Sequence, residues 1–177
     1  MKQIHISFTY LLIFLILVAS ATIMVEAQKC KPSRKVREHD ECDQSNGADC
    51  CEERKSYTAH KRSPPVTKHT PAILTINSFE KGGDGGGPSE CDGKYHDNDT
   101  PIVALSTGWY NKGKRCHHHI KIHANGRTVK AKVVDECDSN RGCLNNIVDA
   151  SKAVWKALGF KESDDEWGWT KVTWADA

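Results

Sequence analysis

The stretch IKIHANGRTVKAKVVDEC, residues 120–137, decides the fold class of this chain. Asn125-Gly126 stands between two runs in which apolar and polar residues alternate, which is typical of a β-hairpin closed by a two-residue type I′ turn. Alternate side chains of a strand face opposite sides of the sheet. The residues that we predict to face the interior are Ile120, Ile122, Val129, Ala131 and Val133.

The segments on either side of this hairpin are also mostly β in character. AILTINSF from residue 72, IVALSTGWY from residue 102 and WGWTKVTW from residue 167 each carry an apolar or alternating pattern that indicates a strand. Several strands in a small chain favour a closed β-barrel, because closure removes exposed strand edges.

One helix is predicted to interrupt the strands, in DASKAVWKALGF at residues 149–160. Its apolar residues recur at helical spacing. We expect Asp149 to act as the N-cap, Gly159 to take the left-handed position after the helix, and Phe160 to make the hydrophobic contact that closes such an end.

The first 27 residues differ from the rest. Lys2 is followed by a run without charged side chains from Phe8 to Val25, and small residues suitable for cleavage occur at 19–21 and 25–27. This pattern predicts a secretory signal peptide at residues 1–27, which leaves a mature chain without a membrane segment. The alternative is an uncleaved signal anchor, because an uncharged run of about 18 residues is close to membrane-spanning length.

Charge and cysteine content narrow the function classes. The net charge is +2, which argues against nucleic acid as a dedicated partner. An even number of cysteines in an exported chain predicts disulfides before it predicts metal binding or thiol catalysis, but the sequence does not choose their pairing. The cysteines concerned are Cys30, Cys42, Cys50, Cys51, Cys91, Cys116, Cys137 and Cys143.

Composition also indicates how the chain is organised. Residues 28–71 are predicted to form a cysteine-rich N-terminal extension that ends in a basic, proline-containing linker, and residues 72–177 to form the barrel. Within the linker, Lys61-Arg62 is interpreted as part of a solvated connector, with a processing site or a patch for acidic polysaccharide as the alternatives.

Four ungapped motifs resemble a known family. They are LTINSFEKGGDGGGPSECDGKYHDND (74–99), VALSTGWYNKGKRC (103–116), AKVVDECDSNRGC (131–143) and NNIVDASKAVWKALG (145–159). From about Ser63 onward the chain resembles the kiwellins, also called ripening-related proteins, of plants.

The resemblance implies a fold and a class of function. The fold would be mainly β, a six-stranded double-psi β-barrel with one short helix behind a small disulfide-rich extension, related to barwin and to the first domain of expansins. The protein would be secreted to the apoplast and monomeric. It would act in defence or ripening by non-catalytic binding of a protein, such as a secreted microbial enzyme, or of a cell-wall polysaccharide.

The chain departs from the family pattern at two cysteines. Arg62 stands where the family usually has one, and the loop after Cys143 is too short to carry another. The resemblance implies that these two missing cysteines are partners of each other. If they are not, two cysteines of this chain have lost their partners.

The histidine-rich stretch RCHHHIKIH, residues 115–123, raises the possibility of a metal site. If the whole stretch is a strand with its isoleucines inside, Cys116 and His118 share the inner face, and the outward residues are His117, His119, Lys121 and His123. A His-x-His pair can chelate a metal ion, but a site needs three or four ligands, and Lys121 places a like charge between His119 and His123. We therefore interpret them as a polar face whose charge rises as the pH falls, and expect no metal and no cofactor.

Asp135 and Asp149 support the alternative function, a wall polysaccharide hydrolase or loosening protein. Two carboxyl groups that face each other across a groove can catalyse the hydrolysis of a glycosidic bond. Each aspartate also has a structural interpretation, Asp149 as a helix cap and Asp135 as a brace for a loop beside Cys137. We therefore assign no catalytic residue.

The candidate binding surface consists of aromatic and imidazole side chains. Alternation places Trp167 and Trp169 on one face of the last strand and Trp174 on the other. Asn98 begins a glycosylation sequon, and the glycines of GGDGGGPSE (82–90) are interpreted as tight turns rather than a phosphate loop. The residues proposed to contact a partner are Trp109, Tyr110, Trp167, Trp169, His117 and His119.

Overall fold

The structure is a computed structural model that describes residues 34–36, 57–59 and 61–177, all within the unit Lys31–Ala177. Strands β1 (Arg34–Val36) and β2 (Tyr57–Ala59) pair with each other in antiparallel fashion. The predicted signal peptide and Cys30, Cys42, Cys50 and Cys51 lie outside the described residues. Over the described part of the chain, no helix has the length and apolar character needed to cross a bilayer.

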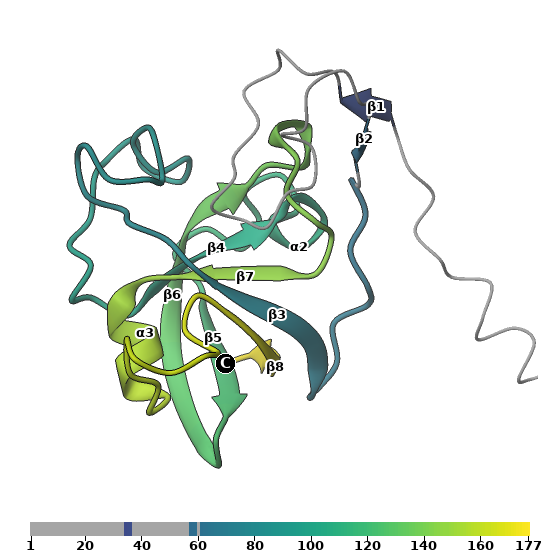
Figure 1. The fold of residues 1–177 in the computed structure, drawn as a ribbon. Helices are drawn as coiled ribbons and strands as arrows, with labels where there is room; N and C mark the ends of the chain where they lie inside the picture. Colours follow the sequence, from purple (N-terminus) through teal and green to yellow (C-terminus); the bar gives the residue numbers. More distant parts are fainter. Residues whose placement is uncertain (1–33, 37–56, 60) are drawn as a thin grey trace, which may run out of the picture. The chain divides into compact units, whose positions relative to one another are not determined.

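Six strands close into a barrel in the order β3-β7-β4-β6-β5-β8 (Figure 1). The β3–β7 and β4–β6 pairs are parallel and the other four are antiparallel. This closed barrel confirms the predicted fold class of a mainly β, six-stranded double-psi barrel. The strands are β3 (Thr70–Ile76), β4 (Ile102–Ser106), β5 (His119–Ala124), β6 (Arg127–Cys137), β7 (Ile147–Ala150) and β8 (Trp169–Asp176).

The β5–β6 hairpin forms as its sequence predicts. Asn125 and Gly126 both have positive φ, 51° and 67°, as a type I′ turn requires. All five residues predicted to face inward are buried in the main core. Trp109 and Trp174 meet there edge to face, with ring centroids 5.0 Å apart. The barrel interior is therefore hydrocarbon and aromatic rings.

Among the described residues there are two short α-helices, where the sequence predicted one. The strand expected to run from residue 102 to residue 110 ends at Ser106, and Thr107–Tyr110 form helix α2, followed by Asn111 in the left-handed conformation. Helix α2 turns Trp109 into the core, where its Nε1–H donates to the carbonyl oxygen of Pro64 at 2.8 Å. At this point the predicted linker packs against the barrel rather than running free.

Helix α3 (Lys152–Ala157) confirms the predicted helix but corrects its start. Its N-cap is Ser151, whereas Asp149 lies two residues earlier in β7 and is buried. At the other end, Gly159 has φ +91° and Phe160 packs on Trp155 with ring centroids 5.1 Å apart, as predicted. Asp149 therefore belongs to the sheet and not to the helix.

Within the described part of the chain, two disulfides tie loops to the barrel. Cys91 pairs with Cys116, and Cys137 pairs with Cys143. The four described cysteines thus pair among themselves. That the two cysteines missing relative to the family are partners of each other stays a prediction.

Candidate functional site

A groove on the outside of the barrel is centred on Ala104 of β4. Ala104 lies opposite Asp149 of β7 on one side and opposite Asp135 of β6 on the other. Its neighbours Val103 and Leu105 point into the core, so Ala104 and both aspartates face outward. At the usual strand spacing, the two aspartate Cα atoms are about 10 Å apart. The methyl group of Ala104 leaves the space between them open.

A β-bulge creates this arrangement. Val103 pairs with Val133, but Ala104 pairs with Asp135, so β6 carries one extra residue, Val134, at this point. Without that shift, Val134 would lie opposite Ala104. Bulges are common beside functional sites because they redirect a side chain.

The groove holds about 400 Å³ and is strongly acidic. One wall is the loop of residues 77–90, and the other is the end of β6 with the 3-10 turn Ser139–Arg141. Among the residues that the structure describes, a single basic one, Arg141, lines the groove. The carboxylates that line it are Glu90, Asp135, Glu136, Asp138 and Asp149.

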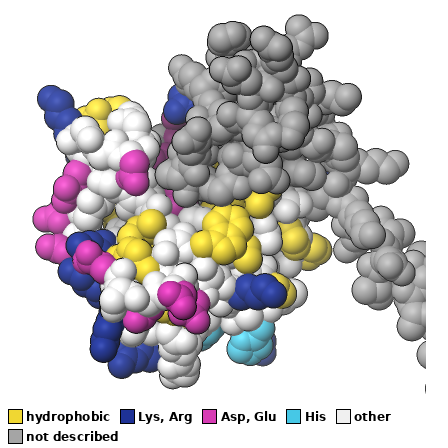
Figure 2. Space-filling model, viewed as in Figure 1, with side chains coloured by type: hydrophobic (Ala, Val, Ile, Leu, Met, Phe, Trp, Pro, Cys, Tyr) yellow, Lys and Arg dark blue, Asp and Glu magenta, His cyan; other side chains and the backbone are white. Residues whose placement is uncertain are grey.

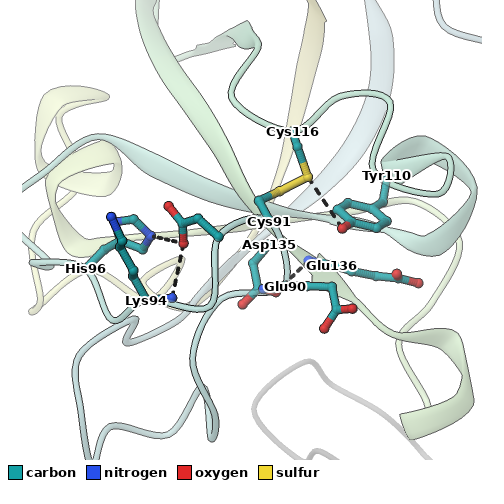
Figure 3. A network of polar contacts seen from close by, with 9 residues as sticks. Glu90, Cys91, Lys94, His96, Tyr110, Cys116, Asp135 and Glu136 are labelled. Atoms are coloured by element: carbon teal, nitrogen blue, oxygen red, sulfur yellow. Dashed lines mark hydrogen bonds and ion pairs between the residues drawn. A yellow bond between two sulfur atoms is a disulfide. The ribbon is translucent and has the colours of Figure 1, made fainter.

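Asp135 holds the loop wall in place. Its Oδ1 accepts the backbone N–H of Glu90 and that of Glu136, each at 2.8 Å (Figure 3). Burial raises the pKa of Asp135 and the charge of Glu90 raises it further, while the two N–H donors offset part of the increase. Asp135 therefore braces a loop, as the sequence suggested, although the loop is the one at Glu90.

Glu136 and Asp138 hold the opposite wall. The Thr107 hydroxyl donates to Glu136 Oε1 at 2.6 Å and accepts the backbone N–H of Ser139 at 2.9 Å. Asp138 caps the 3-10 turn by accepting the backbone N–H of Asn140. Burial raises the pKa of Glu136, and the surrounding carboxylates add to this effect, against the hydrogen bond from Thr107.

Asp149 is the deepest of the groove carboxyls, with 2% of its surface exposed. It lies opposite Thr75 of β3, whose hydroxyl donates to Asp149 Oδ1 at 2.5 Å. Thr75 in turn lies opposite Trp169 of β8. Trp169, Thr75, Asp149, Ala104 and Asp135 thus form one outward row across five neighbouring strands.

The loop wall is also fixed from behind (Figure 3). Cys91, which directly follows this loop, is bonded to Cys116, whose Sγ accepts a hydrogen bond from the hydroxyl of Tyr110 at 3.4 Å. Burial raises the pKa of Tyr110, and the nearby carboxylates raise it further. A few residues on, the carboxylate of Asp92 contacts His96 Nε2 at 3.2 Å. The groove is therefore shaped by cross-links rather than by a free loop.

The predicted histidine strand is wrong at its beginning. Strand β5 begins only at His119, and His117 has φ +64°, so alternation does not extend through residues 116–118. His118 is exposed instead of facing inward with Cys116. His117 and His119 are both exposed. Within the part of the chain that the structure describes, no cluster of three or more His, Cys, Asp or Glu side chains is placed to hold a metal.

The aromatic candidates divide into core and surface residues. Trp109 and Tyr110 are buried, with 1% and 6% exposed, so they belong to the core and not to a contact surface. Gly168, at φ +92°, breaks the alternation that placed Trp167 and Trp169 on one face. Trp167 packs half-buried against Trp155, whereas 44% of Trp169 is exposed. A contact role remains a prediction for these two tryptophans and for His117 and His119.

Asn98, the sequon residue, has a structural role of its own. Its Oδ1 accepts the backbone N–H of Phe79 at 2.9 Å, and its Nδ2 donates to Ser78 Oγ at 2.8 Å. An N-linked glycan would attach to that same nitrogen. Glycosylation at Asn98 remains a prediction.

Comparison with known proteins places the chain in a family. The Kiwellin-1 family model matches residues 21–177. Ripening-related protein grip22 of Vitis vinifera is 56% identical over 145 residues, which cover 76% of this chain and 64% of the relative. Kiwellin of Actinidia chinensis var. chinensis is 55% identical over 134 residues, covering 70% and 62%. The chain thus spans less than two thirds of the length of these two relatives.

A rice relative and a solved structure extend the comparison. Ripening-related protein 3 of Oryza sativa subsp. japonica is 42% identical over 169 residues, which cover 87% of this chain and 78% of the relative. The crystal structure of an expansin from Clavibacter michiganensis aligns with TM-score 0.48 and 22% identity, over 62% of this chain and 50% of that chain. On the family model and the relatives, the chain belongs to the kiwellin family.

Proposed function

We propose that this member of the kiwellin family is a secreted, non-catalytic binding protein that acts in plant defence or ripening. Its contact surface is the acidic groove together with Trp169, and its partner is a protein, such as a secreted microbial enzyme. The observation that carries this proposal is that the groove carboxyls hold the scaffold together. Asp135, Glu136 and Asp149 accept hydrogen bonds from Glu90, Thr107 and Thr75, respectively.

The charge and the hydrogen-bonding groups of the groove favour a basic side chain of the partner. Of the described residues, five with carboxylates and one with a guanidinium line it, so a Lys or Arg of the partner would be attracted to it. Asn77 adds an acceptor, since its Oδ1 is buried and has no hydrogen-bond partner within the described residues. Arginine suits such a site well because its planar guanidinium group carries five N–H donors.

Trp169 supplies the apolar part of the surface. It is exposed and lies in the same strand row as the groove floor. Tryptophan and arginine are the residues that most often dominate protein interfaces. A groove that takes a charged side chain beside an exposed tryptophan is suited to a protein loop.

Substitutions at Gly87 test whether the groove is the surface that binds the partner. It lines the groove, and a Cβ added to it would meet no atom within 4 Å, so the loop has space for a side chain to begin at this position. Wild-type protein, Gly87→Phe and Gly87→Ala would each be immobilised and exposed to apoplastic fluid of infected tissue. We expect the same partner to be retained by wild type and Gly87→Ala and lost with Gly87→Phe. Equal retention by all three would contradict a role for the groove.

Hydrolysis of a wall polysaccharide is the second candidate, and one observation favours it. The raised pKa of Asp135 is a property of general acids, and the row places it across Ala104 from Asp149. Incubation with wall glucans followed by a reducing-end assay separates the two functions. We expect no product. Product formation that Asp135→Asn abolishes would establish the hydrolase instead.

A further inference from the structure

The outer face of the β5–β6 hairpin is basic. Its exposed or half-buried side chains point away from the core residues Ile120, Ile122 and Ala131, which alternate with them. We call this surface the basic face. It consists of His119, Lys121 and His123 of β5 and Lys130 and Lys132 of β6.

The strand register brings these basic groups directly against one another. Lys121 lies opposite Lys130, and His119 lies opposite Lys132. Like charges directly opposite on a sheet are destabilising. In the part of the chain that the structure describes, no carboxylate forms an ion pair with any of these four side chains. The arrangement brings the fold no electrostatic gain, which points to a ligand that supplies the missing negative charge.

The surroundings of the basic face extend its positive charge. A hollow of about 400 Å³ beside it is lined by His119 and Lys130 of the face and by Lys114, Arg115 and His118 of the preceding loop. At the far end, the rings of His69 and His123 are 5.9 Å apart. Figure 2 shows histidine side chains gathered at the lower edge of the molecule, beside a Lys or Arg side chain.

Few carboxylates oppose this charge. Asp176 of β8 lines the hollow, but Arg115 Nε contacts its Oδ1 at 3.0 Å and offsets its charge. The outward residues of β8 opposite β5 are Thr173, which lies opposite His123, and Ala175, which lies opposite Lys121. Lys171, further along β8, is exposed and adds another positive charge.

We propose that the basic face and its hollow bind a polyuronate, an acidic polysaccharide whose charges are carboxylates, and bind it more tightly as the pH falls from about 7 to about 5. Histidine is the side chain that gains positive charge in this range. Carboxylic acids with ordinary pKa values near 4 remain mostly ionised at pH 5. We therefore expect a face that carries histidines to bind such a ligand more tightly at the lower pH, where most of the ligand's charge remains in place.

The composition of the face favours a polysaccharide over a nucleic acid. Single-stranded nucleic acids bind on exposed aromatic rings as well as on charge. Among the described residues, the exposed large hydrophobic side chains are Tyr95 and Trp169, and neither belongs to the basic face or its hollow. The one arginine in the hollow is already bound to Asp176. The site is independent of the acidic groove, so either proposal can fail alone.

The first experiment measures binding of the full mature protein to de-esterified polygalacturonate at low ionic strength, at about pH 5. Methyl-esterified polygalacturonate is the neutral ligand control. Lys121→Glu/Lys130→Glu is compared with Lys81→Glu/Lys161→Glu, which makes the same change in net charge at two exposed lysines outside the face. We expect the first pair to weaken binding about tenfold or more and the second pair to leave it within about twofold.

The second experiment tests the pH dependence of binding. His119→Gln/His123→Gln keeps the side chains polar but removes the imidazoles. We expect wild-type protein to bind several times more tightly at about pH 5 than at about pH 7, and this ratio to shrink in the variant. The proposal would be overturned if both lysine pairs weakened binding equally, or if the esterified polymer bound as tightly as the de-esterified one. It would also be overturned if a single-stranded oligonucleotide of matched charge bound more tightly. Circular dichroism of each variant confirms that a loss of binding is not a loss of fold.

Discussion

The hydroxyl of Thr75 donates to the buried carboxyl of Asp149 across the parallel β3–β7 pair, at 2.5 Å. This contact explains why Asp149 does not cap helix α3. The side chain points outward from the sheet toward the groove, and its partner comes from a strand 74 residues away in sequence. The cap belongs to Ser151 because β7 continues through Ala150 before the helix begins.

Thr75→Val should destabilise the protein, because valine keeps the shape of threonine but removes the hydroxyl that donates to the buried carboxyl of Asp149. We expect a loss of about 1–3 kcal/mol in the free energy of unfolding, the usual contribution of a hydrogen bond to a charged group. Urea unfolding measures it. Thr173→Val on β8 is the matched control, since its hydroxyl makes no hydrogen bond with the described residues, and it should change stability by less than about 0.5 kcal/mol.

The fold was predictable from sequence to a large extent because its signals are local. Asn125-Gly126 needs only two adjacent residues to specify a type I′ turn, and the flanking alternation fixes which side chains are buried. Helix α2 was missed because Thr107–Tyr110 continue an apolar, β-like run, and only packing of Trp109 against Trp174 shows why the chain turns there. Local patterns do not contain that tertiary contact.

The site was less predictable. Asp135 and Asp149 were identified as a pair, but the feature that brings them to one groove is the bulge at Val134, for which the sequence gives no turn or glycine signal. The roles of Ala104 and Thr75 were missed because they depend on strand register between segments far apart in the chain. Alternation also failed at Trp167, because the positive φ of Gly168 interrupts the strand.

Asp135 should make the protein less stable as the pH rises. Its pKa is raised in the folded state, chiefly by burial, so the folded protein binds its proton more tightly than the unfolded chain does. The stabilisation is complete below the ordinary aspartate pKa of about 3.9 and is lost as the pH rises through the folded-state pKa. Asp135→Asn removes this titration while keeping an acceptor for Glu90.

Urea unfolding of wild type and Asp135→Asn between about pH 4 and pH 7 tests this expectation. The variant should gain stability relative to wild type as the pH increases. Asp165→Asn, at an exposed residue outside the groove, is the control. Its free energy of unfolding should change with pH as that of wild type does. A difference between wild type and Asp135→Asn that stays constant with pH, or changes in the opposite direction, would show that the carboxyl is not held protonated by its burial.

The two disulfides should differ in what they contribute to stability. Cys91–Cys116 closes a loop of 25 residues and Cys137–Cys143 one of 6. On the chain-entropy model, their removal costs about 3.5 and about 2 kcal/mol, respectively, because the longer loop restricts the unfolded chain more. Double alanine variants of each pair, unfolded in urea, measure the two costs. A larger loss for the shorter loop would mean that native contacts around Cys137, rather than chain entropy, dominate.

Gly85 should be irreplaceable in the loop wall of the groove, for reasons of space. A Cβ at this position would lie 2.4 Å from the carbonyl oxygen of Ser78 and 2.6 Å from Asn77 Oδ1. Backbone cannot move aside as a flexible side chain can, so Gly85→Ala should cost about 1–3 kcal/mol, the usual penalty of overpacking. Gly87→Ala, in the same loop but with open space around its Cβ, should be nearly neutral. Limited proteolysis locates the effect, because a loop pushed off Asn77 should be cleaved faster within residues 77–90 while the barrel stays intact. Equal stability and equal cleavage of the two variants would mean that the loop does not pack on Asn77, and the groove would lose the wall on which its shape depends.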